Sequence, residues 1–184
     1  MSIATKRGDA GQTDLMYGRR VSKCDRRVAG YGVVDELNAA IGVARVHCAQ
    51  MEIIKVIVEV QDDLIVLMGE MATDEADLDR YVADGFERIE EEIVERASAH
   101  VVRIEEAMNI RFKGWAVPGK EALPGAAFLD VARTVCRRAE RVAAGLAEAG
   151  TLKNKAILSY LNRLSDLLWL LARWEAVSNQ TGKS

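Results

Sequence analysis

Four arginines and one glutamate lie within nine residues of the sequence, in segment 133–141. Arg133, Arg137 and Arg141 are four residues apart and would form one positively charged ridge along a helix. Arg138 and Glu140 lie beside that ridge. Guanidinium groups stay charged and bind phosphate oxygens in pairs, so the ridge could hold a polyphosphate. The alternative is a solvated charged face in which Glu140 pairs locally.

The segment TKRGDAGQT, residues 5–13, is a second candidate for phosphate binding. Its two glycines leave backbone N–H groups accessible, and Lys6 and Arg7 supply positive charge, a combination suited to wrapping phosphates. The alternative is a frayed basic tail, which is common at chain termini.

A third candidate, NRLSD at residues 162–166, interrupts a leucine-rich run. Asn162 and Asp166 would share one face of a helix there. Polar groups within a buried stripe need partners. They therefore form either a hydrogen-bond network inside the fold or the wall of a ligand site.

Other catalytic motifs receive no support. Segment 114–120 resembles the start of a P-loop, but Glu121 stands where Ser or Thr is required and no strand precedes it. His47 and His100 are the only histidines, and neither follows a glutamate by three residues or lies near a Ser or Cys motif. A di-iron bundle and a nucleophilic triad are therefore not indicated. The 3 cysteines have no CxxC spacing and are interpreted as structural.

Long helices are expected to position these residues, because apolar residues recur at spacings of three and four. The predicted helices span residues 33–47, 53–71, 86–108, 126–148 and 155–177. Residues 74–85 and 109–125 are predicted loops, and Asp62, Asp63 and Glu70 are expected to face solvent. The predicted fold is an all-α, up-down antiparallel five-helix bundle. The last helix is apolar around much of its girth, which predicts burial on more than one side and suggests a subunit contact.

Composition agrees with one soluble helical domain. The chain has 184 residues, 49% hydrophobic and 29% charged, with only 2 prolines and 5% aromatics, which argues against an all-β fold. We expect a single domain, with residues 1–28 as an N-terminal arm and 29–184 as the bundle. A net charge of −3 gives no general attraction to nucleic acid or membranes. With neither a spanning segment nor a signal peptide, a cytoplasmic protein is expected.

Five segments, in this order and spacing, resemble the PduO-type ATP:cob(I)alamin adenosyltransferases. They are TKRGDAGQT at 5–13, RVSKCDRRV at 20–28, YGVVDELNAAIG at 31–42, RTVCRRAER at 133–141 and YLNRLSDLLWLLARWE at 160–175. The resemblance covers nearly the whole chain and is more specific than any single motif.

The resemblance implies a cobalamin adenosyltransferase-like homotrimer of five-helix bundles with active sites between subunits. It also implies transfer of the 5′-deoxyadenosyl group of ATP to the cobalt of cob(I)alamin, with Mg²⁺ on the phosphates and triphosphate as the leaving group. A corrinoid reductase and an adenosylcobalamin-dependent enzyme are the partners that such a reaction implies.

Carried over by position, the resemblance assigns the site residues. The ATP-binding residues would be Thr5, Lys6, Arg7, Gly8, Thr13, Asp14, Lys23, Arg137, Arg138, Glu140, Arg141 and Asn162. The residues assigned to catalysis are Asp35, Arg133, Arg137 and Glu140, and Arg133 would pair with Asp35 across the subunit interface. The corrinoid-binding residues would be Trp115, Arg163 and Asp166. No protein ligand for the metal is assigned.

The sequence departs from the family pattern near the corrinoid. Residues 115–118 read WAVP where the family has Phe-Ile-Leu-Pro, so Trp115 is expected to pack under the corrin ring in place of phenylalanine. Asp130 stands where histidine is usual, Arg7 where threonine is common, and segment 119–132 is about two residues longer. Two alternatives follow: a non-catalytic ATP- or corrinoid-binding bundle that senses nucleotide or delivers cofactor, and a purely structural bundle that binds no nucleotide.

Overall fold

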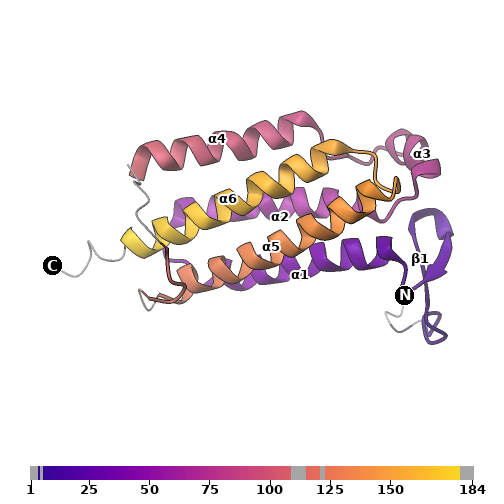
Figure 1. Ribbon diagram of the computed structural model, residues 1–184, viewed down its shortest axis with the longest axis horizontal. Coiled ribbons are helices and arrows are strands. Elements are labelled where there is room, and N and C mark those ends of the chain that lie inside the picture. The colour runs from indigo at the N-terminus through magenta and orange to yellow at the C-terminus, as the bar shows by residue number, and fades with distance from the viewer. Residues whose placement is uncertain (1–3, 5, 109–114, 121–122, 179–184) are drawn as a thin grey trace.

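The computed structural model describes residues 4, 6–108, 115–120 and 123–178, and in these ranges it is a helical bundle with a β-hairpin at one end (Figure 1). The hairpin consists of β1 (Gln12–Asp14), the 3-10 turn η1 (Met16–Gly18) and β2 (Arg20–Ser22). The helices are α1 (Arg26–His47), α2 (Met51–Met71), α3 (Leu78–Ala83), α4 (Glu91–Met108), α5 (Pro124–Glu148) and α6 (Lys155–Ser178), and the 3-10 turn η2 (Glu75–Asp77) precedes α3. The all-α prediction is confirmed, but the described ranges hold six helices and a two-stranded sheet rather than five helices.

The apolar faces of the five long helices meet in one core. Helix α1 packs against α5 and α2, and α6 packs against α5 and α4. Leu37, Leu129 and Tyr160 are among the large side chains that this packing buries completely. Helices α4 and α5 cover α6 within one chain. The apolar residues on several sides of α6 therefore do not by themselves indicate a subunit contact. No helix of the described ranges is long and apolar enough to cross a membrane.

Helix α1 begins at Arg26, seven residues before the predicted start at Val33. Asp25 caps it, because the Asp25 carboxylate accepts the Arg27 backbone N–H at 2.7 Å. Glycines obscured this first part of the helix in the sequence. One of them, Gly30, lies close against its neighbours, since a Cβ there would lie 2.8 Å from Met71 Cε and that side chain would have to shift. The predicted boundary between arm and bundle at residue 28 thus falls inside α1.

The prediction that Asp63 and Glu70 face solvent is wrong, although Asp62 is exposed as predicted. Glu70 is 2% exposed and accepts hydrogen bonds from Arg88 Nε and the Ile89 backbone N–H, both at 2.9 Å. These bonds hold residues 86–90 outside the helix, which is why α4 begins at Glu91 rather than at Phe86. Asp63 pairs with Arg96 and accepts the Tyr160 hydroxyl hydrogen at 3.2 Å. Buried carboxylates are tolerated when they are paired in this way.

Segment 74–85, predicted as a loop, contains η2 and the short helix α3. Asp74 caps this segment by accepting the Ala76 backbone N–H at 3.0 Å. A helix of six residues offers too few turns for apolar periodicity to reveal it. This segment lies beside the hairpin at the same end of the bundle (Figure 1).

Candidate functional site

The arginines of α5 lie on its outer surface. Arg137, Arg138 and Arg141 are exposed, whereas Glu140 is half-buried. Arg137 Nη1 lies 3.9 Å from Glu140 Oε2, and Arg138 pairs with Glu36 of α1. Exposed ion pairs of this kind contribute little to stability, so these guanidinium groups can exchange their partners for phosphate oxygens at small cost.

Helices α5 and α6 bring further predicted residues to the same level of the bundle. The Cys136 thiol donates to the Leu161 carbonyl with 3.3 Å between sulfur and oxygen, so the next residues, Arg137 and Asn162, are level with each other. Asn162 is exposed, and so is Asp166. These two residues therefore do not form a buried network, and the other interpretation, the wall of a ligand site, is retained.

Arg133 and Asp35 do not pair within one chain. Arg133 Nε is 3.5 Å from Asp130 Oδ1 on its own helix, whereas Asp35 is an exposed residue of α1. Asp35 immediately precedes Glu36, the partner of Arg138. Sequence reasoning missed Glu36 as a neighbour of the arginine ridge, although it belongs to the same Val-Asp-Glu segment.

The N-terminal candidates gather on the β-hairpin. Asp14 pairs with Arg7 at 2.9 Å and with Arg20 at 3.1 Å, and Arg20 also donates to the Arg7 carbonyl. A Cβ on Gly8 would lie 2.9 Å from Lys23 Nζ, so the Lys23 ammonium group lies directly over this glycine. The arm is therefore an ordered, positively charged loop from Lys6 onward rather than a frayed tail. Thr5 lies outside the described residues.

Thr13 connects the hairpin to the bundle. It pairs with Val21 across the strands, and its side chain lies beside Tyr31 of α1. Neither Tyr31 nor Arg20 was assigned to the site from the sequence, although both stand within segments that carry the family resemblance.

The hairpin is also attached to the segment around α3. Arg19 forms a two-pronged ion pair with Asp77, and the Tyr17 hydroxyl donates to Asp84 at 2.9 Å. The Arg80 guanidinium lies 4.1 Å from the centre of the Tyr17 ring. Tyr17 has a φ of +62°, a conformation uncommon for a bulky residue, and these contacts hold it there.

The hairpin and the arginine ridge do not meet within one chain. Figure 1 shows the hairpin at the end of the bundle beside the start of α1, where α5 ends. Among the described residues, no hydrogen bond or ion pair joins residues 6–25 to Arg133, Arg137, Arg138 or Arg141. The two predicted halves of the ATP site are thus separate within this chain.

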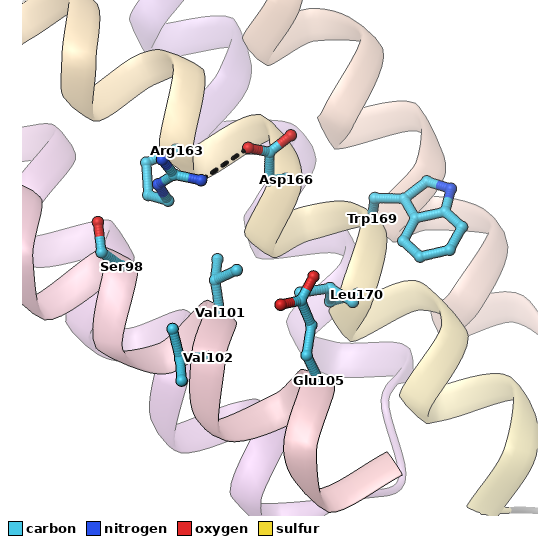
Figure 2. A pocket seen from close by; sticks show the side chains of 8 residues that line it. All are labelled: Ser98, Val101, Val102, Glu105, Arg163, Asp166, Trp169 and Leu170. Atoms are coloured by element: carbon cyan, nitrogen blue, oxygen red, sulfur yellow. Dashed lines mark hydrogen bonds and ion pairs between the residues drawn. The ribbon is translucent and has the colours of Figure 1, made fainter. Parts of the chain in front are cut away.

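The predicted corrinoid residues Arg163 and Asp166 face a groove between α4 and α6. The groove has a volume of about 390 Å³, and Arg163 Nη1 pairs with Asp166 Oδ2 at 3.1 Å along its edge (Figure 2). Glu105 of α4, which sequence reasoning did not select, lines it opposite them. Trp115 is 97% exposed, so its indole ring is accessible to a ligand or to another chain.

The cysteines and possible metal ligands do not add a further reactive centre. Burial raises the pKa of the Cys136 thiol and raises that of Cys48 to about 12, so both remain protonated near neutral pH. All 3 cysteines are free thiols, and Cys48 and Cys136 are buried whereas Cys24 is exposed. In the described part of the chain, no three His, Cys, Asp or Glu side chains gather where they could hold a metal ion.

The chain is similar to corrinoid adenosyltransferases over nearly all of its length. Residues 3–175 match the family model described as cobalamin adenosyltransferase. The chain is 38% identical to the corrinoid adenosyltransferase of Citrobacter freundii, covering 94% of each protein. It is 35% identical to the corrinoid adenosyltransferase PduO of Salmonella typhimurium over 95% of this chain and 50% of that longer protein. A variant of the PduO-type ATP:corrinoid adenosyltransferase of Lactobacillus reuteri, complexed with cobalamin and ATP, has the same fold, with a TM-score of 0.84, 30% identity and coverage of 97% and 96%.

Proposed function

The chain belongs to the cobalamin adenosyltransferase family and is an ATP:corrinoid adenosyltransferase, and we propose that its corrinoid substrate is cob(I)alamin. In this reaction the electron pair of Co(I) forms a bond to C5′ of ATP while the C5′–O5′ bond breaks. Triphosphate leaves with the bonding pair, and the second product is adenosylcobalamin.

The exposed ridge of α5 beside Asn162 is the observation that carries this proposal. A departing triphosphate gains negative charge at the bridging oxygen, and fixed guanidinium groups stabilise that charge most when they are positioned beforehand. Arg137 is only loosely engaged by Glu140, at 3.9 Å, and can bind phosphate without losing a strong ion pair. We assign Arg137, Arg138 and Arg141 to the phosphates, Asn162 to ATP, and Glu140 to the orientation of Arg137.

The hairpin supplies the other side of the ATP site in this proposal. Its glycine turn, with Lys6, Arg7 and Lys23 around it, offers positive charge to phosphate oxygens, while the Asp9 and Gly11 backbone N–H groups close the turn on the Lys6 and Gly8 carbonyls. Gly8, Thr13 and Asp14 shape that loop, and Thr5 is assigned with them. Because the hairpin does not contact the ridge of its own chain, we propose that it completes the site of a neighbouring subunit in a homotrimer. Asp35 would then pair with Arg133 across the interface.

The corrinoid side is assigned to the groove of α4 and α6 and to Trp115. Corrin side chains carry amides, which can bond to the exposed Arg163–Asp166 pair, while an indole ring can cover a macrocycle face. Trp115 in place of phenylalanine offers a larger ring for that contact. Together, these residues would hold the corrinoid with its cobalt in line with C5′ of ATP.

Mg²⁺ accompanies ATP in the proposed reaction. Mg²⁺ favours oxygen ligands and is often bound through substrate phosphates. We therefore assign it no ligand from this chain. The proposal also includes one functional domain over 1–184, a cytoplasmic location, and indirect partners in a corrinoid reductase and an adenosylcobalamin-dependent enzyme. It includes no nucleic acid or membrane partner.

The test is anaerobic incubation of chemically reduced cob(I)alamin with ATP and Mg²⁺. We expect the absorbance of adenosylcobalamin to appear together with one triphosphate per turnover. ATP binding by calorimetry without conversion would instead favour the sensor or cofactor-delivery alternative. Neither binding nor conversion would favour a purely structural bundle.

A further inference from the structure

Two arginines share one buried carboxylate between α5 and α6. Asp130 is 3% exposed, and its Oδ2 accepts a hydrogen bond from Arg173 of α6. Its Oδ1 lies 3.5 Å from Arg133 Nε. Two guanidinium groups on one carboxylate leave one positive charge without a counter-charge.

The two arginines are bound unequally. At 3.5 Å, Arg133 is at the outer limit of a hydrogen bond, and its side chain is 25% exposed. The Arg173 side chain is 12% exposed and makes the closer contact. Arg133 is therefore the arginine that can leave.

Arg173 has unused hydrogen-bond donors at this site. Its Nε and Nη1 atoms are buried and have no hydrogen-bond partner. The Nε–H and Nη2–H groups of a guanidinium lie side by side and match the two oxygens of a carboxylate. Arg173 uses only Nη2, while the oxygen that Nε would take is the one that Arg133 approaches.

We propose that Asp130 is a positioning residue that holds Arg133 loosely in the free subunit and releases it to the carboxylate of a second copy of this chain. On release, Arg173 Nε takes over Oδ1 and completes a two-pronged bond to Asp130. The buried N–H group of Arg173 gains a partner as Arg133 leaves, so the exchange offsets the lost contact. This inference rests on the proposed function, in which Arg133 pairs with Asp35 of the neighbouring subunit.

The exchange predicts that a second substitution, at Asp130, restores what a substitution of Arg173 removes. Arg173→Met removes the competitor, so Asp130 binds Arg133 alone and retains it. We expect subunit dissociation on dilution to become easier by about tenfold, the effect of losing one ion pair between subunits, with a parallel fall in turnover. Adding Asp130→Asn removes the charge that captures Arg133 and should restore both assembly and turnover.

Sedimentation velocity across a dilution series measures assembly without any assumption about chemistry. Arg96→Met is the matched control, because Arg96 likewise pairs with a buried carboxylate, Asp63, but between α2 and α4. We expect it to lower the melting temperature without changing the dissociation constant. If Arg173→Met does not fold, Arg173→Lys, which keeps the charge but lacks the fork, should weaken assembly in the same direction.

The outcomes separate this inference from the proposed function. Folded Arg173→Met with wild-type assembly, or a double variant no better than the single one, would overturn the exchange even if the wild-type enzyme is active. An inactive wild-type protein would reject the proposed function, whereas the dilution series would still decide whether Asp130 controls assembly.

Discussion

The Cys136 thiol of α5 donates to the Leu161 carbonyl of α6, with 3.3 Å between sulfur and oxygen. This contact fixes the register of the two helices at the level where Arg137 and Asn162 reach the surface. A buried thiol that is held protonated is a suitable donor there, because burial raises its pKa. Arg137 and Asn162, two of the side chains assigned to ATP, are thus positioned by the bundle core rather than by a loop.

Arg137→Ala should reduce turnover strongly. Losing a guanidinium that stabilises the leaving triphosphate corresponds to about 2 to 4 kcal/mol, or roughly 30- to 1,000-fold. The turnover of Arg137→Lys should fall between those of the wild type and Arg137→Ala, since lysine keeps the positive charge but lacks the guanidinium group that binds two oxygens. Arg45→Ala, at an exposed arginine of α1 bonded to Gln61, is the control and should leave turnover unchanged. Initial rates with cob(I)alamin measure the turnover of each variant. Near-wild-type activity of Arg137→Ala would remove this residue from the site.

Arg19→Ala should loosen the hairpin and raise the KM for ATP. The Arg19 guanidinium lowers the pKa of Asp77 through their hydrogen bond, so the pair stays ionised at neutral pH. The Arg19–Asp77 pair is exposed, so its loss should raise the KM for ATP by about two- to fivefold, with little change in kcat. Lys55→Ala breaks an exposed pair on α2 away from the hairpin and should change neither value. A kcat effect with unchanged KM would mean that the attachment does not position the ATP loop.

Asp63 should make stability depend on pH in the acid range. Burial raises the pKa of the Asp63 carboxyl above its ordinary value, even though Arg96 opposes the shift. The folded state therefore binds more protons at this site than the unfolded chain between the two pKa values. Stability falls as pH rises from the ordinary aspartate value through the raised one.

Asp63→Asn removes this contribution. The difference in unfolding free energy, wild type minus variant, should decrease with rising pH over that window and be constant above it. Urea unfolding at a series of pH values measures the difference. A difference that increases with pH would mean that the Arg96 ion pair outweighs burial.

Trp115→Ala should separate the two substrates. The side chain is 97% exposed, so its removal should leave the melting temperature unchanged. ATP affinity by calorimetry should also persist, whereas conversion of cob(II)alamin under a reducing system should slow, with recovery in Trp115→Phe. Val46→Ala, at another exposed apolar side chain, is the control. Equal losses of ATP binding and conversion would contradict the assignment of Trp115 to the corrinoid.

Apolar periodicity predicted the five long helices, with the starts of α1 and α4 misplaced, but it did not predict which of their charged residues are buried. It placed the starts of α2 and α5 within two residues, because their core-facing side chains repeat regularly. It misjudged Glu70, since nothing in the local pattern reveals that Arg88 and Ile89 return to bind its carboxylate. Burial of a charge depends on partners distant in sequence.

The candidate site was predictable as a set of residues rather than as an arrangement. Spacing showed that Arg133, Arg137 and Arg141 share a face, but not that Arg133 would approach Asp130 while Arg138 bonds to Glu36. The separation of hairpin and ridge could not be predicted either, because it depends on how far α1 and α5 extend.

Mixed assemblies of Asp35→Asn and Arg133→Met subunits should recover activity that neither variant has alone. If each site takes Asp35 from one subunit and Arg133 from the next, random mixing at equal amounts leaves about a quarter of the sites intact in a closed ring. If each site lay within one subunit, every subunit would be defective and no activity would return. The measurement is turnover after joint refolding, with each variant refolded alone as the reference. Recovery near a quarter of the wild-type rate would support a shared site, and its absence in assembled protein would contradict the pairing of Arg133 with Asp35 between subunits.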